Sequence, residues 1–349
     1  MTMKMTREKP ILALVPGDPT GIGPELTAKV LASGQLRDVA DFLVVGDRHV
    51  MEMGASQAGV TLALHSIGAA DQANFDQNAT PIIDLANFAP GSFVIGGPDP
   101  SVGKRVGQTL SHAIDLARTG AVQGICFAPL HKKAMFDGGW QFPDEHQLFA
   151  HLLDHKGLFR EMNVLGNQWM SRVTSHVSLR QALDLITDAS ICDALRLTDR
   201  VLRRAGIEAP RIAVAALNPH GGEGGLFGRE EIDIIAPAVA KMAAEGINCT
   251  GPFPSDTVYI KAFAGAFDSV LAMYHDQGQI ATKLRGFNKG VTITAGLSTI
   301  FTTPAHGTAY DIVGQGIADP GAFENAIQLA ARLAKNGGTA APASGDERP

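Results

Sequence analysis

Short apolar runs alternate along the chain with stretches in which apolar residues recur at helical spacing. The runs typical of strands cover residues 11–15, 42–46, 92–95, 124–127, 211–217 and 269–274. The stretches typical of amphipathic helices cover 24–32, 109–118, 180–187, 193–204 and 231–245. Strands that alternate with helices indicate an α/β fold built on a largely parallel sheet. A chain of 349 residues is long enough for about two such domains.

Composition and charge exclude several classes of protein. The net charge is −6 and the basic residues form no stripe, which argues against a nucleic-acid partner. No apolar run reaches the roughly 18 residues of a membrane span, and the N-terminus lacks the apolar segment of a secretory signal. Cys126, Cys192 and Cys249 lie far apart without a CxxC pair, so we expect buried or free thiols and a cytoplasmic protein.

A glycine-rich turn follows the first expected strand. It reads PGDPTGIGPE from Pro16 to Glu25 and leads into a helix. Its glycines would let the backbone approach a ligand, and a helix N-terminus favours anions. We therefore predict that Gly17 and Asp18 contact the substrate. The alternative is a turn that only connects strand and helix, and the spacing is not the GxGxxG of a standard dinucleotide-binding fold.

Three histidines lie in polar, glycine-rich surroundings after apolar runs. They are His176, His220 and His275, and ligands of α/β sheets gather outside the carboxyl ends of strands. Three imidazoles can hold a divalent cation and leave a position open for substrate, with Asp276 placed to orient one ring. The cation would be Zn²⁺, with Co²⁺ or Mg²⁺ as alternatives. Each histidine taken alone could instead be a structural residue.

Two further segments could carry chemistry. Asp256 in the sequence PSDT, together with Lys283 and the pair His131-Lys132, forms a plausible set for proton transfer. The alternative is that this Asp simply caps a helix or turn. The segment HGTAYDIVGQGIADP, which starts at His306, is too long and too specific in residue type to be a turn alone.

Together these motifs resemble the 4-hydroxythreonine-4-phosphate dehydrogenase family over residues 11–333. The marks are PGDPTGIGPEL, LNPHGGEGGLFGREE, GPFPSDT, MYHDQGQIATKLRGF and HGTAYDIVGQGIAD. The last also looks like the cofactor loop of β-decarboxylating dehydrogenases. The resemblance implies a two-domain fold like isocitrate and isopropylmalate dehydrogenases, with the active site in the interdomain cleft. The expected domains are 1–130 plus 301–336 and 131–300, followed by a disordered tail at 337–349.

The resemblance also implies roles for individual residues. His176, His220 and His275 would be the metal ligands, and Asp256 and Lys283 would lie at the reacting carbon. The residues that would receive NAD are His306, Gly307, Thr308, Ala309, Asp311, Gly314 and Gly316. The implied reaction oxidises a secondary alcohol beside a carboxylate-bearing carbon, after which the β-keto acid loses CO₂. A homodimer in which each site borrows residues from the partner is implied as well.

The sequence departs from the family at positions expected to touch a small-molecule substrate. Glu145 and His146 replace a His-Thr pair, and Thr292 and Phe301 take the places of an Asn and an Arg. Losing cationic donors disfavours a phosphate. We therefore expect Glu145, His146 and Thr292 to bind a carboxylated cis-dihydrodiol of the terephthalate type. The alternatives are 4-hydroxythreonine 4-phosphate, 4-phosphothreonate or 4-phosphoerythronate and, in another class, acyl transfer of the phosphotransacetylase type.

Overall fold

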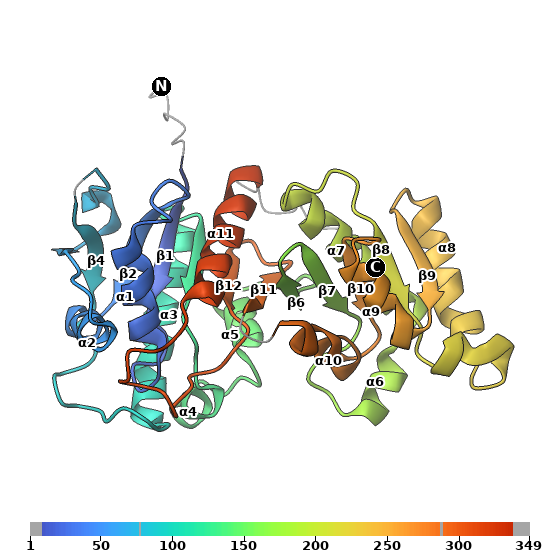
Figure 1. Cartoon of the computed structure of the whole chain (residues 1–349), viewed down its shortest axis with the longest axis horizontal. Coiled ribbons are helices and arrows are strands. Elements are labelled where there is room, and N and C mark those ends of the chain that lie inside the picture. The colour runs from blue at the N-terminus through green and yellow to red at the C-terminus, as the bar shows by residue number, and fades with distance from the viewer. Residues whose placement is uncertain (1–8, 77, 287–288, 338–349) are drawn as a thin grey trace. The chain divides into compact units, whose positions relative to one another are not determined.

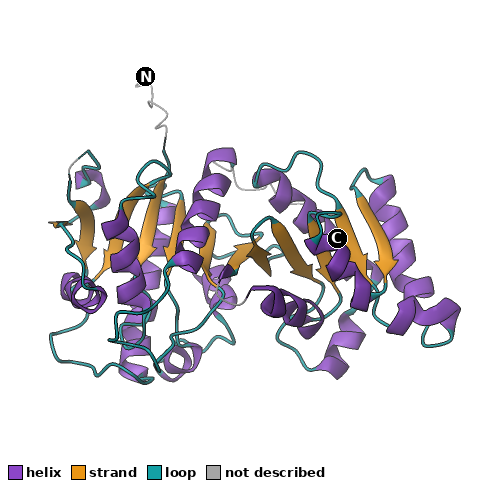
Figure 2. Ribbon diagram, in the orientation of Figure 1, coloured by secondary structure: helices purple, strands orange, loops and turns teal. Residues whose placement is uncertain are grey.

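The structure, a computed structural model, describes residues 9–76, 78–286 and 289–337 and divides the chain into two compact units. The first unit is Met1–Lys156 with Leu297–Pro349, and the second is Gly157–Gly296. Both are built from strands and helices in alternation, so the predicted α/β class is confirmed (Figures 1 and 2). Residues 131–156, expected in the second domain, cluster with the first unit, and the expected tail from 338 on lies outside the described residues.

The first unit contains a parallel sheet of the order β3-β4-β2-β1-β5-β12. Its strands are β1 (Ile11–Val15), β2 (Asp41–Gly46), β3 (Leu64–Ile67), β4 (Thr80–Asp84), β5 (Gly124–Phe127) and β12 (Ile300–Pro304). Its helices are α1 (Gly23–Ser33), α2 (Arg48–Ala58), the short η1 (Ala70–Gln72), α3 (Pro100–Arg118), α4 (Lys132–Asp137), α5 (Glu145–Leu152) and α11 (Gly321–Asn336).

The predicted strand at 92–95 is wrong. These residues form bends between β4 and α3, and Val94 is 82% exposed, so an apolar run there does not mark a buried strand. The place beside β2 is taken by β4, whose central Ile82 is fully buried. The strands at 11–15 and 124–127 are confirmed at their predicted bounds, because both are buried between helices and contain little but apolar residues.

The second unit contains a mixed sheet of the order β11-β6-β7-β10-β8-β9. Its strands are β6 (Arg160–Leu165), β7 (Gln168–Arg172), β8 (Ile212–Ala215), β9 (Cys249–Phe253), β10 (Ser269–Ala272) and β11 (Val291–Ala295). Strand β6 is antiparallel to both neighbours, whereas β7, β10, β8 and β9 run parallel. Its helices are α6 (Leu179–Leu185), α7 (Asp188–Arg204), η2 (Pro219–Gly225), η3 (Glu231–Ile235), α8 (Ala236–Ala244), α9 (Ser255–Phe263) and α10 (His275–Gly286).

All three cysteines are buried and free, as predicted. Burial raises the pKa of the Cys126 thiol to about 12. Within the part of the chain that the structure describes, no helix has both the length and the apolar character needed to cross a membrane.

Candidate active site

One edge of the second unit's sheet gathers most of the predicted chemistry. The parallel strands β7, β10, β8 and β9 are neighbours, and their carboxyl ends lie at the same edge. His176 follows β7, His275 follows β10, His220 follows β8 and Asp256 follows β9. The prediction that the histidines lie beyond strand ends is therefore confirmed, and it extends to the aspartate.

His176 and His275 lie together at this edge. Their ring centres are 5.6 Å apart, and both rings line a cavity of about 190 Å³ whose other walls include Val177, Leu179 and Tyr274. Two imidazoles that share a tetrahedral Zn²⁺ have ring centres about 5 Å apart, given Zn–N distances near 2 Å. The pair therefore fits two positions of a divalent metal site.

A carboxylate lies beside each of these two rings. Asp276 Oδ1 is 2.7 Å from His275 Nδ1, and Glu161 Oε2 is 3.5 Å from His176 Nε2. A carboxylate at one ring nitrogen sets the tautomer and makes the other nitrogen a better metal ligand. Asp276 was expected in this role from the sequence, whereas Glu161, on the neighbouring strand β6, was not. Arg172, buried behind Glu161, lies 3.6 Å from its carboxylate and balances its charge.

His220 is presented by a different kind of backbone. Residues 220–224 all have left-handed φ angles, from 43° at Glu223 to 79° at Gly222. Three of them are glycines, whereas His220 and Glu223 are L-residues, which rarely adopt this region. His176 also has a positive φ of 52°. Strained backbone of this kind concentrates at functional sites. Among the described residues, however, no three His, Cys, Asp or Glu side chains are placed to hold a metal ion, so the three-histidine set stays a prediction.

Glu231 holds the loop that carries His220. This buried carboxylate accepts hydrogen bonds from the backbone amides of Leu217 (2.8 Å) and Asn218 (2.7 Å) and from the Asn218 side chain (2.9 Å). Burial raises its pKa, but the hydrogen bonds from Asn218 and Leu217 outweigh this and keep the pKa below its ordinary value. A Cβ at Gly222 would lie 2.7 Å from Glu231 Oε2, so only glycine fits beside the carboxylate.

Gln277, in the segment MYHDQGQIATKLRGF, is a positioning residue whose role the sequence does not reveal. Its side chain accepts a hydrogen bond from the Met273 amide at 2.7 Å, and it donates to the Ala216 carbonyl and the Ser255 hydroxyl. One amide group therefore joins the ends of β8 and β10 to the first turns of α9 and α10. Because α9 carries Asp256 and α10 begins at His275, Gln277 keeps these two groups at the same edge.

Asp256 and Lys283 are both exposed, one in the first turn of α9 and the other in the last turn of α10. Exposure leaves both side chains accessible to a substrate. Their predicted roles at the reacting carbon stay predictions.

The glycine-rich turn of the first unit packs closely against other backbone segments of the same unit. A Cβ at Gly17 would lie 2.5 Å from the Ala128 carbonyl oxygen, and one at Gly21 would lie 2.6 Å from that of Thr308. Asp18 is 1% exposed, and its Oδ1 accepts hydrogen bonds from the amide (2.9 Å) and the hydroxyl (2.7 Å) of Thr20. The close approach predicted from the glycines is therefore present, but towards backbone. Contact of Gly17 and Asp18 with substrate stays a prediction.

A buried polar group joins this turn to the predicted cofactor loop. The Tyr310 hydroxyl donates to Asp18 Oδ2 at 3.5 Å, and the Tyr310 ring lies 5.6 Å from that of His131. Burial raises the pKa of Asp18, although the hydrogen bonds from Thr20 oppose it. His131 was expected in the proton-transfer set, and Tyr310 lies in the predicted cofactor loop. Their proximity to each other could not be predicted, because it depends on packing between distant segments.

The predicted cofactor loop begins after β12 and combines a buried anchor with exposed residues. Thr308 is buried and its carbonyl accepts a hydrogen bond from the Ile22 amide at 3.0 Å. Gly307, Asp311 and Gly314 are exposed, and nothing lies within 4 Å of the Cβ position of Gly307. An exposed carboxylate beside open backbone fits the hydroxyl-rich ribose of a dinucleotide.

The residues that set this chain apart from the family contact other side chains of the same chain. Glu145 is 8% exposed and its carboxylate lies 2.8 Å from Lys132 Nζ. The neighbouring His146 is also buried, and Thr292 accepts a hydrogen bond from Asn163 at 3.0 Å. Phe301 is fully buried and stacks on Phe149 with ring centres 4.2 Å apart. Phe301 therefore belongs to the core, and its correspondence to an Arg of the family stays a prediction.

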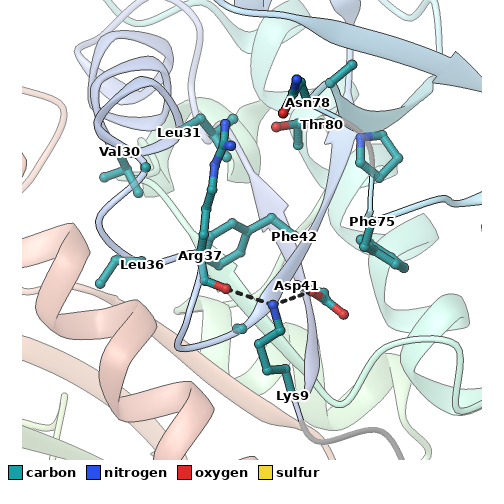
Figure 3. A pocket seen from close by; sticks show the side chains of 14 residues that line it. Lys9, Val30, Leu31, Leu36, Arg37, Asp41, Phe42, Phe75, Asn78 and Thr80 are labelled. Carbon is teal, nitrogen blue, oxygen red and sulfur yellow. Dashed lines mark hydrogen bonds and ion pairs between the residues drawn. The ribbon is translucent and has the colours of Figure 1, made fainter.

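A second cavity lies in the first unit, away from every predicted site residue (Figure 3). Its volume is about 80 Å³, and Val30, Leu31 and Phe42 form an apolar wall. Lys9 at its wall is already engaged, because Lys9 Nζ donates to the Arg37 carbonyl and lies 3.3 Å from Asp41. This cavity therefore adds nothing to the candidate site.

Comparison with known proteins identifies close relatives over nearly the whole chain. The sequence pattern of the family "Pyridoxal phosphate biosynthetic protein PdxA" matches residues 38–330. A protein of Rhizobium meliloti named "Putative 4-hydroxythreonine-4-phosphate dehydrogenase 2" is 47% identical and covers 95% of each chain. The crystal structure of 4-hydroxythreonine-4-phosphate dehydrogenase from Klebsiella pneumoniae is 40% identical, covers 93% of this chain and 99% of that one, and has a TM-score of 0.81. A terephthalate 1,2-cis-dihydrodiol dehydrogenase from Burkholderia xenovorans is 29% identical, covers 93% and 98%, and has a TM-score of 0.63.

Proposed function

The chain belongs to the PdxA family, and from this premise we propose that it oxidises a small phosphorylated hydroxy acid with NAD and a divalent metal. It is an oxidoreductase that acts on a CH–OH group. The substrate we propose is 4-hydroxythreonine 4-phosphate, or else 4-phosphothreonate or 4-phosphoerythronate.

The comparisons favour a phosphorylated substrate over the ring dihydrodiol expected from the sequence. The relatives named for 4-hydroxythreonine 4-phosphate are more similar in sequence and structure than the dihydrodiol dehydrogenase is. The physical argument for the ring diol also weakens. Phe301 lies in the core, so it does not show that a cation is missing from the pocket, and the charge of Glu145 is balanced by Lys132.

The observation that carries the proposal is the pair His176 and His275, each beside a carboxylate and facing one cavity at the carboxyl edge of the sheet. With His220 they would hold Zn²⁺, or alternatively Co²⁺ or Mg²⁺. Such an ion, when bound, lowers the pKa of an alcohol and stabilises negative charge on oxygen. Asp276 keeps His275 in one tautomer, and the Glu161 carboxylate lies beside the ring of His176.

The chain's remaining residues would orient the reactants and move protons. Residues 306–316 would receive NAD, with Asp311 exposed to accept a ribose hydroxyl. Asp256 and Lys283 are the exposed proton-carrying groups at the ends of α9 and α10. Oxidation of an alcohol next to a carboxylate-bearing carbon produces a β-keto acid, and we propose that this acid loses CO₂.

We also propose that the working enzyme is a homodimer with shared sites. His220 does not join the other two histidines within one chain, and Leu226 and Phe227 beside it are 73% and 48% exposed. On the same unit, α6 exposes Leu179, Leu183 and Leu185 next to the cavity. Exposed apolar side chains of this number indicate a protein partner. A second copy that brings its own His220 would cover them and complete the set.

The test measures NAD reduction in the presence of Zn²⁺, Co²⁺ or Mg²⁺, with NADH absorbance as the readout. The substrates are 4-hydroxythreonine 4-phosphate, 4-phosphothreonate, 4-phosphoerythronate and terephthalate cis-dihydrodiol. We expect turnover of a phosphorylated acid, its loss in His275→Ala, and no change in His65→Ala, which removes an exposed histidine from β3. Turnover of the dihydrodiol alone would overturn the substrate class. Formation of an acyl phosphate without NAD would instead indicate an acyl transferase.

A further inference from the structure

Helix α1 holds the far end of the predicted cofactor loop through one lysine. Lys29 Nζ donates hydrogen bonds to the carbonyls of Gly316 (2.9 Å) and Ala318 (2.7 Å) and to Glu25 Oε1 (2.7 Å). An ammonium group has three N–H donors, so these three acceptors use all of them. Glu25 Oε1 also accepts the backbone amide of Ala318 at 2.9 Å. The two side chains therefore bind both sides of the loop's last peptide groups.

Because the Glu25–Lys29 pair is buried, the stability of each charge depends strongly on the other. The side chain of Glu25 is fully buried and that of Lys29 is 19% exposed. A buried carboxylate left without its cation is costly, because the protein interior solvates charge poorly. Removing Lys29 would therefore disturb Glu25 and, through it, the Ala318 amide.

The loop is also held at its first residues by α1 and at Gly316 by α2. The Ile22 amide, at the start of α1, donates to the Thr308 carbonyl at 3.0 Å. Gly316 has a φ of 72°, and a Cβ there would lie 2.6 Å from the Gln57 carbonyl oxygen of α2. Figure 1 shows the loop, in red, passing beside α1 on its way to α11. Both ends of residues 308–318 are thus fastened to the first two turns of α1.

Between these anchors the loop contains two residues with left-handed backbone. Ala309 and Gly314 have φ angles of 46° and 78°, in the region that costs free energy for most residues. A binding loop that is already ordered loses less entropy when its ligand arrives.

We infer that Glu25 and Lys29 are positioning residues for the dinucleotide. They form a latch, defined as the Glu25–Lys29 ion pair with its bonds to Gly316 and Ala318, which orders residues 308–318 before NAD binds. The inference rests on the proposed function, in which this loop receives NAD. In this inference the glycine-rich turn and α1 order the cofactor loop. This role differs from both alternatives considered for the turn, which were contact with the substrate and simple connection of strand and helix.

The test compares Lys29→Met and Glu25→Gln with Lys133→Met. Lys133 forms an exposed i,i+4 pair with Asp137 on α4, so it controls for loss of a helical ion pair that does not touch the loop. In Lys29→Met and Glu25→Gln we expect faster hydrogen exchange of the amides of residues 309–318. We also expect KM for NAD to rise about tenfold, as it would if the loop were competent in about a tenth of the molecules. The value of kcat should change much less, and Lys133→Met should leave all three readouts unchanged.

The outcomes separate the latch from the proposed function. Unchanged KM and unchanged exchange in both variants would overturn the latch while leaving the proposed function intact. A wild-type chain that binds and reduces no NAD would overturn the proposed function and the dinucleotide role of the latch together. If Lys29→Met fails to fold, Glu25→Gln decides the question, because it keeps the side chain's shape and removes only its charge.

Discussion

The left-handed loop after β8 allows a matched pair of substitutions. Gly222 and Gly224 both have positive φ angles, 79° and 64°, in the same turn that carries His220. A Cβ added at Gly222 would lie 2.7 Å from Glu231 Oε2 and 3.0 Å from the Gly228 carbonyl oxygen. At Gly224 the same atom would meet nothing within 4 Å. Alanine at the two positions therefore differs only in what its methyl group displaces.

The expected costs follow from these contacts. Backbone strain in the left-handed region costs roughly 1 kcal/mol for alanine at either position. Gly222→Ala must also move the Glu231 carboxylate away from the Leu217 and Asn218 donors. Losing one hydrogen bond to a charged group costs about 1.5–3 kcal/mol. We expect the free energy of unfolding to fall by about 3 kcal/mol in Gly222→Ala and by about 1 kcal/mol in Gly224→Ala.

The assay is urea unfolding, monitored through tryptophan fluorescence. The chain has two tryptophans, Trp140 in the first unit and the fully buried Trp169 on β7 in the second. In a Trp140→Phe background the signal reports on the second unit alone. Glu231 links the end of β8 to the segment that continues into α8, so damage at the loop should reach the whole unit. Equal losses in the two variants, or a greater loss in Gly224→Ala, would refute the role assigned to Glu231.

Two more predictions test the site and the core. Because hydrogen bonds hold the pKa of Glu231 below its ordinary value of 4.5, its stabilising contribution is present above that value and is lost as pH falls through the lower, folded-state pKa. Glu231→Gln should therefore flatten the acid limb of the unfolding free energy, measured by urea titration across that range. Phe301→Ala should lower the free energy of unfolding by about 3–5 kcal/mol in a circular-dichroism titration. A substrate KM that changes while stability does not would contradict its place in the core.

Local sequence signals located some elements well and missed others for a physical reason. The turn after β1 leads into α1 with Pro24 in the first turn, as predicted. Before His176 the sequence indicated only a short apolar run and not the bounds of β7, because Gln168 and Arg172 interrupt the apolar pattern of this strand, although both are buried. Arg172 is acceptable there because Glu161 and Asn163, on the neighbouring strand, pair with it. A polar residue whose partner lies on a neighbouring strand cannot be recognised as a core residue by periodicity.

Residue types and their order determined the α/β class, the histidines beyond strand ends and the chemistry that imidazoles and carboxylates can supply. Only the tertiary structure decided which of these groups meet. It brought His176 to His275, kept His220 on a separate loop and turned the glycines of residues 17–23 towards protein backbone. It also placed Phe301 in the core and fastened the predicted cofactor loop to Lys29. Such contacts join residues up to hundreds of positions apart, and packing and burial in the folded chain set their energies.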